Sequence, residues 1–115
     1  MMDVVGRKPC ILSMGCTPSI VYPLNQQLVD LGLEGSVGLV VADNEQTYSE
    51  LTRVVKSHRF DGFVVGFGVR GNRPWFQKVL ATVASADPNL PLLEHRGPSD
   101  LIPAIERHFN LKLIV

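Results

Sequence analysis

The stretch Phe60–Pro74, FDGFVVGFGVRGNRP, decides the fold. Asp61-Gly62 is a turn signal, and a continuous apolar run from Phe63 to Phe67 follows it. Such a run is typical of a strand that is buried on both faces in the middle of a parallel sheet. A glycine-rich turn and a helix-opening proline come next. The order strand, turn, helix predicts an α/β unit.

The same alternation continues on both sides of this stretch, because short apolar runs alternate with segments of helical periodicity. The other predicted strands are Cys10–Met14, Val37–Ala42, Leu90–Leu93 and Leu111–Val115. The predicted helices are one ending near Gly32 or Gly35, one capped by Asp43-Asn44, one from about Pro74 to Ser85, and one capped by Ser99 and ended by a left-handed Asn110. We therefore expect a three-layer α/β fold with a four- to five-stranded parallel sheet in the flavodoxin-like (Rossmann-like) order 2-1-3-4-5.

The start of the first helix has two interpretations. Thr17 before Pro18 is a favourable pair for an N-cap and a first turn, which would leave Pro23 inside the helix. Alternatively, a loop runs to Tyr22 and the helix starts at Pro23. We favour the second interpretation, because a proline inside a helix removes a backbone hydrogen bond.

Composition indicates a globular chain and excludes several classes of partner. The 115 residues suit one domain spanning 1–115, and 45% of them are apolar. Eleven basic and eleven acidic residues leave no positive excess to neutralise phosphates, so we expect no nucleic acid and no acidic membrane surface as a partner. No apolar run approaches the ~20 residues of a membrane span, and no signal-peptide pattern opens the sequence.

Cys10 and Cys16 are expected to be free thiols. If both lie along one strand, they are roughly 20 Å apart at about 3.3 Å per residue, which excludes a bridge between them. Free thiols are typical of a reducing compartment, so we expect a cytoplasmic protein.

The predicted ligand site lies beyond the carboxyl ends of the first and third strands, where the connections leave in opposite directions. The three glycines at 66, 68 and 71 would take positive φ and let the backbone approach a ligand, and Arg70 and Arg73 would add charge. These features predict a site for a phosphate- or carboxylate-bearing small molecule. The predicted ligand-binding residues are Cys16, Thr17, Ser19, Asp43, Gly68, Arg70, Gly71, Asn72 and Arg73. In the alternative interpretation, the glycines only permit a tight turn and close helix packing.

Two residues are candidates for catalysis. Cys16 would lie at a helix N-terminus, where a thiolate forms more readily, but we favour the alternative that it is an inert small residue where strand meets loop. His95 would lie at the same edge and could form an acid–base pair with Glu94 or Asp43, or simply cap a strand end. No Cys/His spacing matches a zinc site, so no metal is expected, and no particular cofactor is indicated.

Three resemblances accompany these patterns. The rhythm of Phe60–Arg70 resembles the third-strand region of response-regulator receiver domains, with Gly66 at the position of the phospho-accepting aspartate and Gly15-Cys16 in place of the acidic pair. This resemblance implies a non-phosphorylated relative of the receiver architecture. Asp61–Arg70, DGFVVGFGVR, also resembles a segment of small uncharacterised microbial proteins and implies no activity. The sequence CTPS at 16–19 resembles the C-x-x-S variant of thioredoxin-like redox sites.

Two further functions compete with ligand binding. The apolar C-terminal sequence LKLIV could form an edge strand, which is prone to pair with another chain. This predicts a non-catalytic interaction or self-assembling module, and possible homo-oligomers. A small enzyme that depends on Cys16 is the other alternative.

Overall fold

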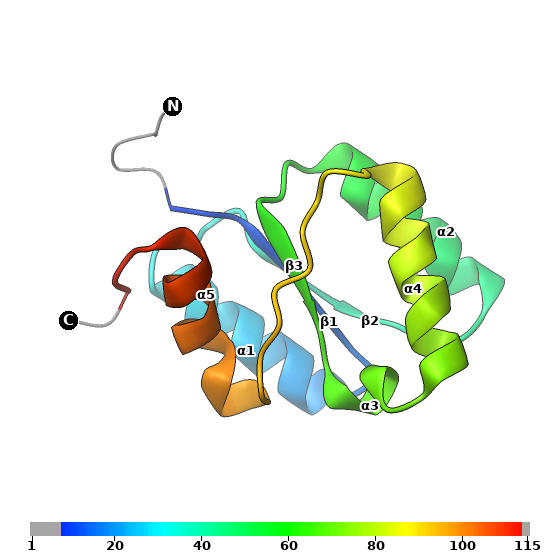
Figure 1. Cartoon of the computed structure of the whole chain (residues 1–115), viewed down its shortest axis with the longest axis horizontal. Helices are drawn as coiled ribbons and strands as arrows, with labels where there is room; N and C mark the ends of the chain where they lie inside the picture. Colours follow the sequence, from blue (N-terminus) through cyan, green and yellow to red (C-terminus); the bar gives the residue numbers. More distant parts are fainter. Residues whose placement is uncertain (1–7, 114–115) are drawn as a thin grey trace.

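The computed structural model describes residues 8–113. Its strands and helices alternate along the chain, as the apolar pattern predicts (Figure 1). The strands are β1 (Ile11–Gly15), β2 (Val37–Val40) and β3 (Gly62–Val65). The helices are α1 (Pro18–Asp30), α2 (Glu45–Ser57), α3 (Phe67–Arg70), α4 (Arg73–Ala86) and α5 (Leu101–Phe109), with a short 3₁₀ helix, η1 (Pro98–Asp100), before α5.

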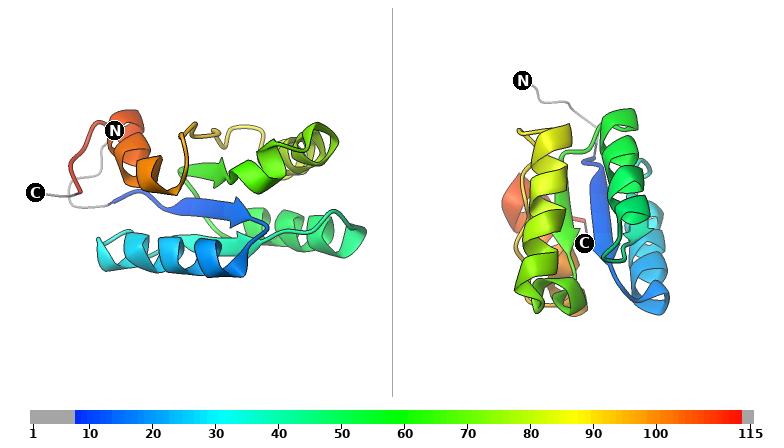
Figure 2. Two further views of the ribbon diagram at one scale, coloured as in Figure 1. Left: turned by 90° about the horizontal axis from the view of Figure 1, so that it is seen from below. Right: turned by 90° about the vertical axis from the view of Figure 1, so that its right-hand side faces the viewer.

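The sheet is parallel and has the order β2-β1-β3. Its register places Leu12 opposite Val37 on one side and opposite Phe63 on the other. Helices α1 and α5 cover one face and α2 and α4 cover the other, so the molecule has three layers (Figures 1 and 2). Every residue of β1 and β3 is buried, whereas β2 at the edge is half-buried throughout. The structure confirms the α/β class and places the Phe63 run beside β1, but β1 is the central strand of this sheet and β3 is an outer strand that is buried on both faces.

Apolar side chains form a separate core on each face of the sheet, because successive residues of a strand point to opposite faces. The α2/α4 face buries Leu12 and Met14 of β1 with Phe63 and Val65 of β3. The α1/α5 face buries Ile11 and Val64, together with Leu28, Leu33, Leu93, Leu101, Ile102 and Ile105. Ser13 shares the orientation of Ile11 and therefore points to the α1/α5 face.

A double hydrogen bond joins the amino ends of β1 and β3. The Asp61 amide donates to the Cys10 carbonyl, and the Cys10 amide donates to Oδ2 of Asp61, both at 2.8 Å. The turn that the sequence places before the third strand therefore fixes β3 against β1. As a result, the carboxyl ends of β1 and β3 meet at one edge of the sheet.

The sheet has three strands within residues 8–113, so the predicted fourth and fifth strands need correction. Leu90–Leu93 lies beside β3 but forms a single bridge, between Leu92 and Phe63. Pro91 within this segment has no amide hydrogen to donate, which prevents a longer ladder. The described part of the fifth predicted strand, residues 111–113, does not form a β-strand. Leu113 packs in the α1/α5 core instead, and residues 114 and 115 lie outside the described range.

Three predicted helix boundaries also change. Helix α1 starts at Pro18, so the preferred start at Pro23 was wrong. Pro23 lies early in the helix, where its missing amide removes only the bond to the exposed Ser19. The glycine-rich turn contains the unpredicted helix α3. Ser99 lies within η1 rather than at a cap, whereas Asn110 ends α5 in the predicted left-handed conformation with φ 54°.

Membrane-spanning helices are absent from the described part of the chain, where no helix has the length and apolar character to cross a bilayer.

Candidate functional site

A cavity of about 180 Å³ lies at the carboxyl edge of the sheet, on the α1/α5 face. Its walls come from β1, β3, the first turns of α1, the start of α3 and the loop that leads into α5. Among the described residues that line it, no side chain is charged. The lining residues are Ser13, Met14, Gly15, Cys16, Thr17, Ile20, Val21, Leu24, Val64, Gly66, Phe67, Gly68, His95, Gly97, Pro98 and Leu101.

Two polar side chains in this wall are buried and have no hydrogen-bond partner in the protein. Ser13 is 4% exposed and His95 is 7% exposed, and Ser13 Oγ and His95 Nδ1 are both unpaired. Ser36, the other buried serine, differs, because its Oγ accepts a hydrogen bond from the Ile11 amide at 3.0 Å. Unpaired buried polar atoms are uncommon and costly in native proteins. Ser13 and His95 therefore mark this cavity as the candidate site.

The loop after residue 93 holds His95 over the cavity. Nη1 of Arg70 donates to the His95 carbonyl at 2.9 Å, and the His95 and Phe67 rings stack with centroids 6.0 Å apart. Gly97 has φ 135°, a conformation that side chains disfavour. Its carbonyl accepts a hydrogen bond from the Asp100 amide at 3.0 Å. These contacts fix the loop from both sides and explain why His95 stays buried.

The environment of His95 keeps its imidazole neutral. Burial lowers the pKa of His95 below its ordinary value, and the positive charge of Arg70 lowers it further, while Asp100 acts in the opposite direction. Neither predicted acid–base partner is close. Glu94 lines a different hollow, with Arg107 and His108, and Asp43 lies in a separate network described below.

Acidification is expected to destabilise the protein through His95. The folded-state pKa lies below the ordinary 6.5, so the unfolded chain binds more protons between these two values and the free energy of unfolding rises with pH. The contribution is complete above about pH 6.5 and is lost as the pH falls through the folded-state pKa. Urea unfolding between about pH 7.5 and about pH 5 should show a shallower pH dependence for His95→Phe than for wild type. An unchanged slope would contradict this assignment, and His108→Gln serves as the control.

The two predicted loops do meet at the cavity. An added Cβ on Gly68 would lie 2.5 Å from the Cys16 sulfur. The structure corrects the reason for the glycines, because positive φ among the described residues occurs only at Gly32, Gly97 and Asn110. Gly66 and Gly71 have φ of −69° and −70°. Gly68 is thus required for close approach between α3 and the β1–α1 loop.

The effect of Gly68→Ala on the free energy of unfolding is expected to depend on the residue at position 16: a loss with cysteine there and a gain with alanine. In wild type the new methyl group meets the Cys16 sulfur, so we expect a loss of about 1 kcal/mol in the free energy of unfolding. In a Cys16→Ala background the space is open, and alanine in place of glycine should stabilise by about 0.5 kcal/mol. Urea unfolding of the four proteins gives the coupling energy. A coupling near zero would mean that the two loops do not touch.

The structure divides the predicted ligand-binding residues into separate groups. Cys16, Thr17 and Gly68 line the cavity with His95. Arg70, Gly71 and Arg73 line a different, open hollow beside Phe76. The Arg70 guanidinium there lies 4.5 Å from the centre of the Phe67 ring. Asn72 Oδ1 accepts the Trp75 amide at 3.2 Å and so caps α4, and Ser19 is exposed on α1.

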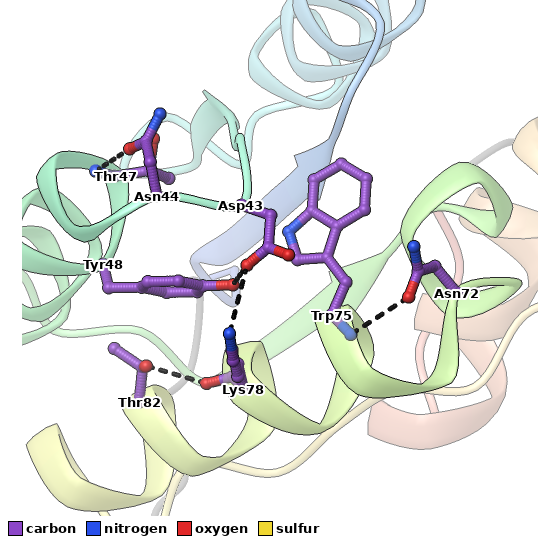
Figure 3. A network of polar contacts seen from close by, with 8 residues as sticks. All are labelled: Asp43, Asn44, Thr47, Tyr48, Asn72, Trp75, Lys78 and Thr82. Atoms are coloured by element: carbon purple, nitrogen blue, oxygen red, sulfur yellow. Dashed lines mark hydrogen bonds and ion pairs between the residues drawn. The ribbon is translucent and has the colours of Figure 1, made fainter.

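Asp43 lies apart from both groups, in the loop between β2 and α2, where its contacts join α2 to α4 (Figure 3). Its Oδ1 accepts a hydrogen bond from the Tyr48 hydroxyl at 2.5 Å and lies 3.7 Å from the Lys78 amine. Burial, the hydrogen bond and the charge of Asp43 raise the pKa of Tyr48 to about 12. Trp75 lies beside this network with an unpaired Nε1. Asp43 therefore holds helices together and does not face the cavity.

Sequence reasoning named Cys16, Thr17, Gly68 and His95 but missed Ser13 and the apolar residues of the cavity wall. Ser13 interrupts the apolar run of the first strand, and that interruption in a strand buried on both faces was the available signal. Ile20, Leu24 and Leu101 have the ordinary pattern of core helix residues, so nothing in the sequence distinguishes them. Their part in the site follows only from the packing of α1 and α5 around the open end of the sheet.

Within residues 8–113, no cluster of three or more His, Cys, Asp or Glu side chains is placed to hold a metal ion. Comparison of the chain with protein-family models, with curated proteins and with solved structures gives no match. The assignment of the candidate site therefore depends on the geometry of the cavity alone.

Proposed function

We propose that this chain binds a small molecule in the cavity between α1, α5 and the carboxyl ends of β1 and β3. The observation that carries the proposal is the pair of unpaired polar atoms, Ser13 Oγ and His95 Nδ1, in the wall of one cavity. A ligand that bonds to both would remove the cost of their burial. The position agrees with the rule that ligands of parallel α/β sheets bind beyond the carboxyl ends of the strands.

Binding is favoured over catalysis. Ser13 Oγ and His95 Nδ1 both lack partners, so they are not bonded to each other as a nucleophile and its base would be. The Cys16 sulfur has the Thr17 hydroxyl as a hydrogen-bond partner, at 3.9 Å, and a hydroxyl is not a general base that would activate the thiol. The hypothesis of a Cys16-dependent enzyme therefore stays a prediction without a supporting contact.

A second candidate function is anion binding in the hollow lined by Arg70, Gly71 and Arg73. The observation that favours it is the presence of two guanidinium groups on one open surface, because guanidinium suits phosphate and carboxylate. This keeps the phosphate- or carboxylate-bearing ligand predicted from the sequence but moves it outside the cavity. Arg70 is already engaged by the His95 carbonyl and the Phe67 ring, so Arg73 would provide most of the binding.

A pair of variants separates the two candidate functions. His95→Phe keeps a ring beside Phe67 and removes the nitrogen, and Arg73→Ala removes a charge from the hollow. Nuclear magnetic resonance titrations would use inorganic phosphate and a set of small alcohols, amides and carboxylic acids. A cavity ligand should bind about tenfold more weakly to His95→Phe and equally to Arg73→Ala. Phosphate in the hollow should bind about tenfold more weakly to Arg73→Ala and equally to His95→Phe. If no compound shifts the Ser13 and Val64 resonances, the cavity proposal is wrong.

We also propose the finer features of the fold, the location and the assembly of this chain. Leu92 pairs with Phe63 beside β3, which supports the fourth position of the flavodoxin-like order 2-1-3-4. Kinship with receiver domains, a cytoplasmic location and a homo-oligomeric state stay predictions. Leu113 is buried against α5 in the chain itself, so assembly through the C-terminal segment would require it to leave that core.

A further inference from the structure

The cavity has an unusual order of polarity from its inner end to its mouth. The inner residues Ser13 and His95 are polar and 4% and 7% exposed. At the mouth, the exposed lining residues include two large apolar side chains, Ile20 and Phe67, which are 45% and 49% exposed, beside the smaller Cys16, Thr17, Gly68 and Pro98. Val21, Leu24, Val64 and Leu101 form apolar walls between the two ends. Soluble proteins usually place polar groups at the outer end, so this order needs an explanation.

We propose, as a deepening of the proposed binding function, that the ligand is an amphiphilic small molecule. Its uncharged hydrogen-bonding head reaches Ser13 and His95, and its apolar tail leaves the cavity over Ile20 and Phe67. The tail covers the two exposed apolar side chains, and the head satisfies the two buried polar atoms. A hydroxyl or primary amide head suits the site, because each both donates and accepts hydrogen bonds.

The charges around the cavity exclude an ionised head. No charged side chain among the described residues lines the cavity, so an ionised head of either sign would lose its hydration without gaining an oppositely charged partner in the wall. Arg70, which does not belong to this lining, is already engaged by the His95 carbonyl at 2.9 Å and by the Phe67 ring. The imidazole itself is neutral near pH 7, because burial and Arg70 lower the pKa of His95.

The volume of the cavity limits the length of the buried part. A cavity of about 150 Å³ holds a benzene molecule in a comparable apolar site, and this cavity measures about 180 Å³. The head and about the first six carbon atoms of the tail therefore fill it. Further carbon atoms contact Ile20 and Phe67 at the mouth. Sugars and nucleotides do not fit this description, because they carry polar groups along their whole length.

The test is a nuclear magnetic resonance titration of the full chain with straight-chain primary alcohols from butanol to octanol. Carboxylates and alkylammonium ions of equal length, and inorganic phosphate, are the comparison probes. Alcohol affinity should rise about fourfold with each added methylene group. At equal chain length the alcohol should bind at least about tenfold more tightly than either ion. Ser13→Ala should weaken alcohol binding about fivefold.

Two exposed apolar residues of α1 provide a matched control for the tail. Ile20 lines the cavity, whereas Tyr22, at 54% exposed, does not. Ile20→Ala should weaken octanol binding more than butanol binding, and Tyr22→Ala should change neither. Tighter binding of the carboxylate, or no gain with chain length, would overturn the proposed ligand class and leave cavity binding intact. Absence of any response at Ser13 and Val64 to every probe would overturn both proposals.

Discussion

Ser13→Ala is expected to raise the free energy of unfolding of the ligand-free protein by about 1 kcal/mol. The substitution removes a hydroxyl that is buried on the central strand and has no hydrogen-bond partner, and it leaves the apolar neighbours in place. Most substitutions of buried residues destabilise a protein, so a gain at this position would be informative. It would indicate that the serine is kept for binding at a cost in stability. Urea unfolding monitored by circular dichroism measures the change.

The matched control is Ser36→Ala, the same substitution at the other buried serine. Ser36 Oγ accepts the Ile11 amide at 3.0 Å, so its removal leaves a buried backbone donor unpaired. We expect a loss of about 2 kcal/mol at this position. The two alanine variants should therefore differ by about 3 kcal/mol with opposite signs. Equal losses at both positions would show that Ser13 also supports the fold, and the central argument for the cavity would fail.

Gly62→Ala is expected to lower the free energy of unfolding by about 2–3 kcal/mol. A Cβ at this position of β3 would lie 2.9–3.0 Å from three side-chain atoms of Leu93, which is 2% exposed. Leu93 is packed in the α1/α5 core, and it belongs to the segment that leads to His95. The substitution should therefore also displace His95 from the cavity.

The control for this prediction is Gly66→Ala, at the residue that follows β3. A Cβ there would meet its nearest neighbours, the Met14 carbonyl and the Gly15 Cα, at 3.6 and 3.7 Å. These are ordinary contacts, and the φ of −69° suits alanine. We expect a change within about 0.5 kcal/mol. Similar losses for both variants in thermal unfolding would contradict the close packing of Leu93 on β3.

The central part of the fold could be predicted because local and long-range signals agree there. The apolar run after Asp61-Gly62 is typical of a strand buried on both faces, and Asn44 carries the side chain that caps α2. The Thr47 amide donates to Asn44 Oδ1 at 2.8 Å, as a cap requires. The meeting of the two loops beside the cavity also followed, because parallel strands bring their carboxyl-end loops to one edge.

The errors occur where two local signals compete or where packing decides. Pro23 is a valid helix start and also a tolerable early helix residue, and sequence alone does not separate the two. The apolar sequence at 111–113 suits an edge strand or a core contact equally well, and packing against α5 selects the second. Arg70 lines an open hollow and also donates to the His95 carbonyl. Nothing in the sequence indicates this second contact, because its partner is 25 residues away in the chain.

Pro23 has a consequence for how the cavity opens. It divides α1 into a short leading segment, which carries Ile20, and a longer body anchored by Leu28 in the core. Since the proline nitrogen cannot bond the Ser19 carbonyl, the leading segment is tied to the body by fewer backbone bonds. We expect its amides to exchange with solvent faster than those of the helix body. A ligand would then enter the cavity by displacing this first part of α1, and the sheet would stay unchanged.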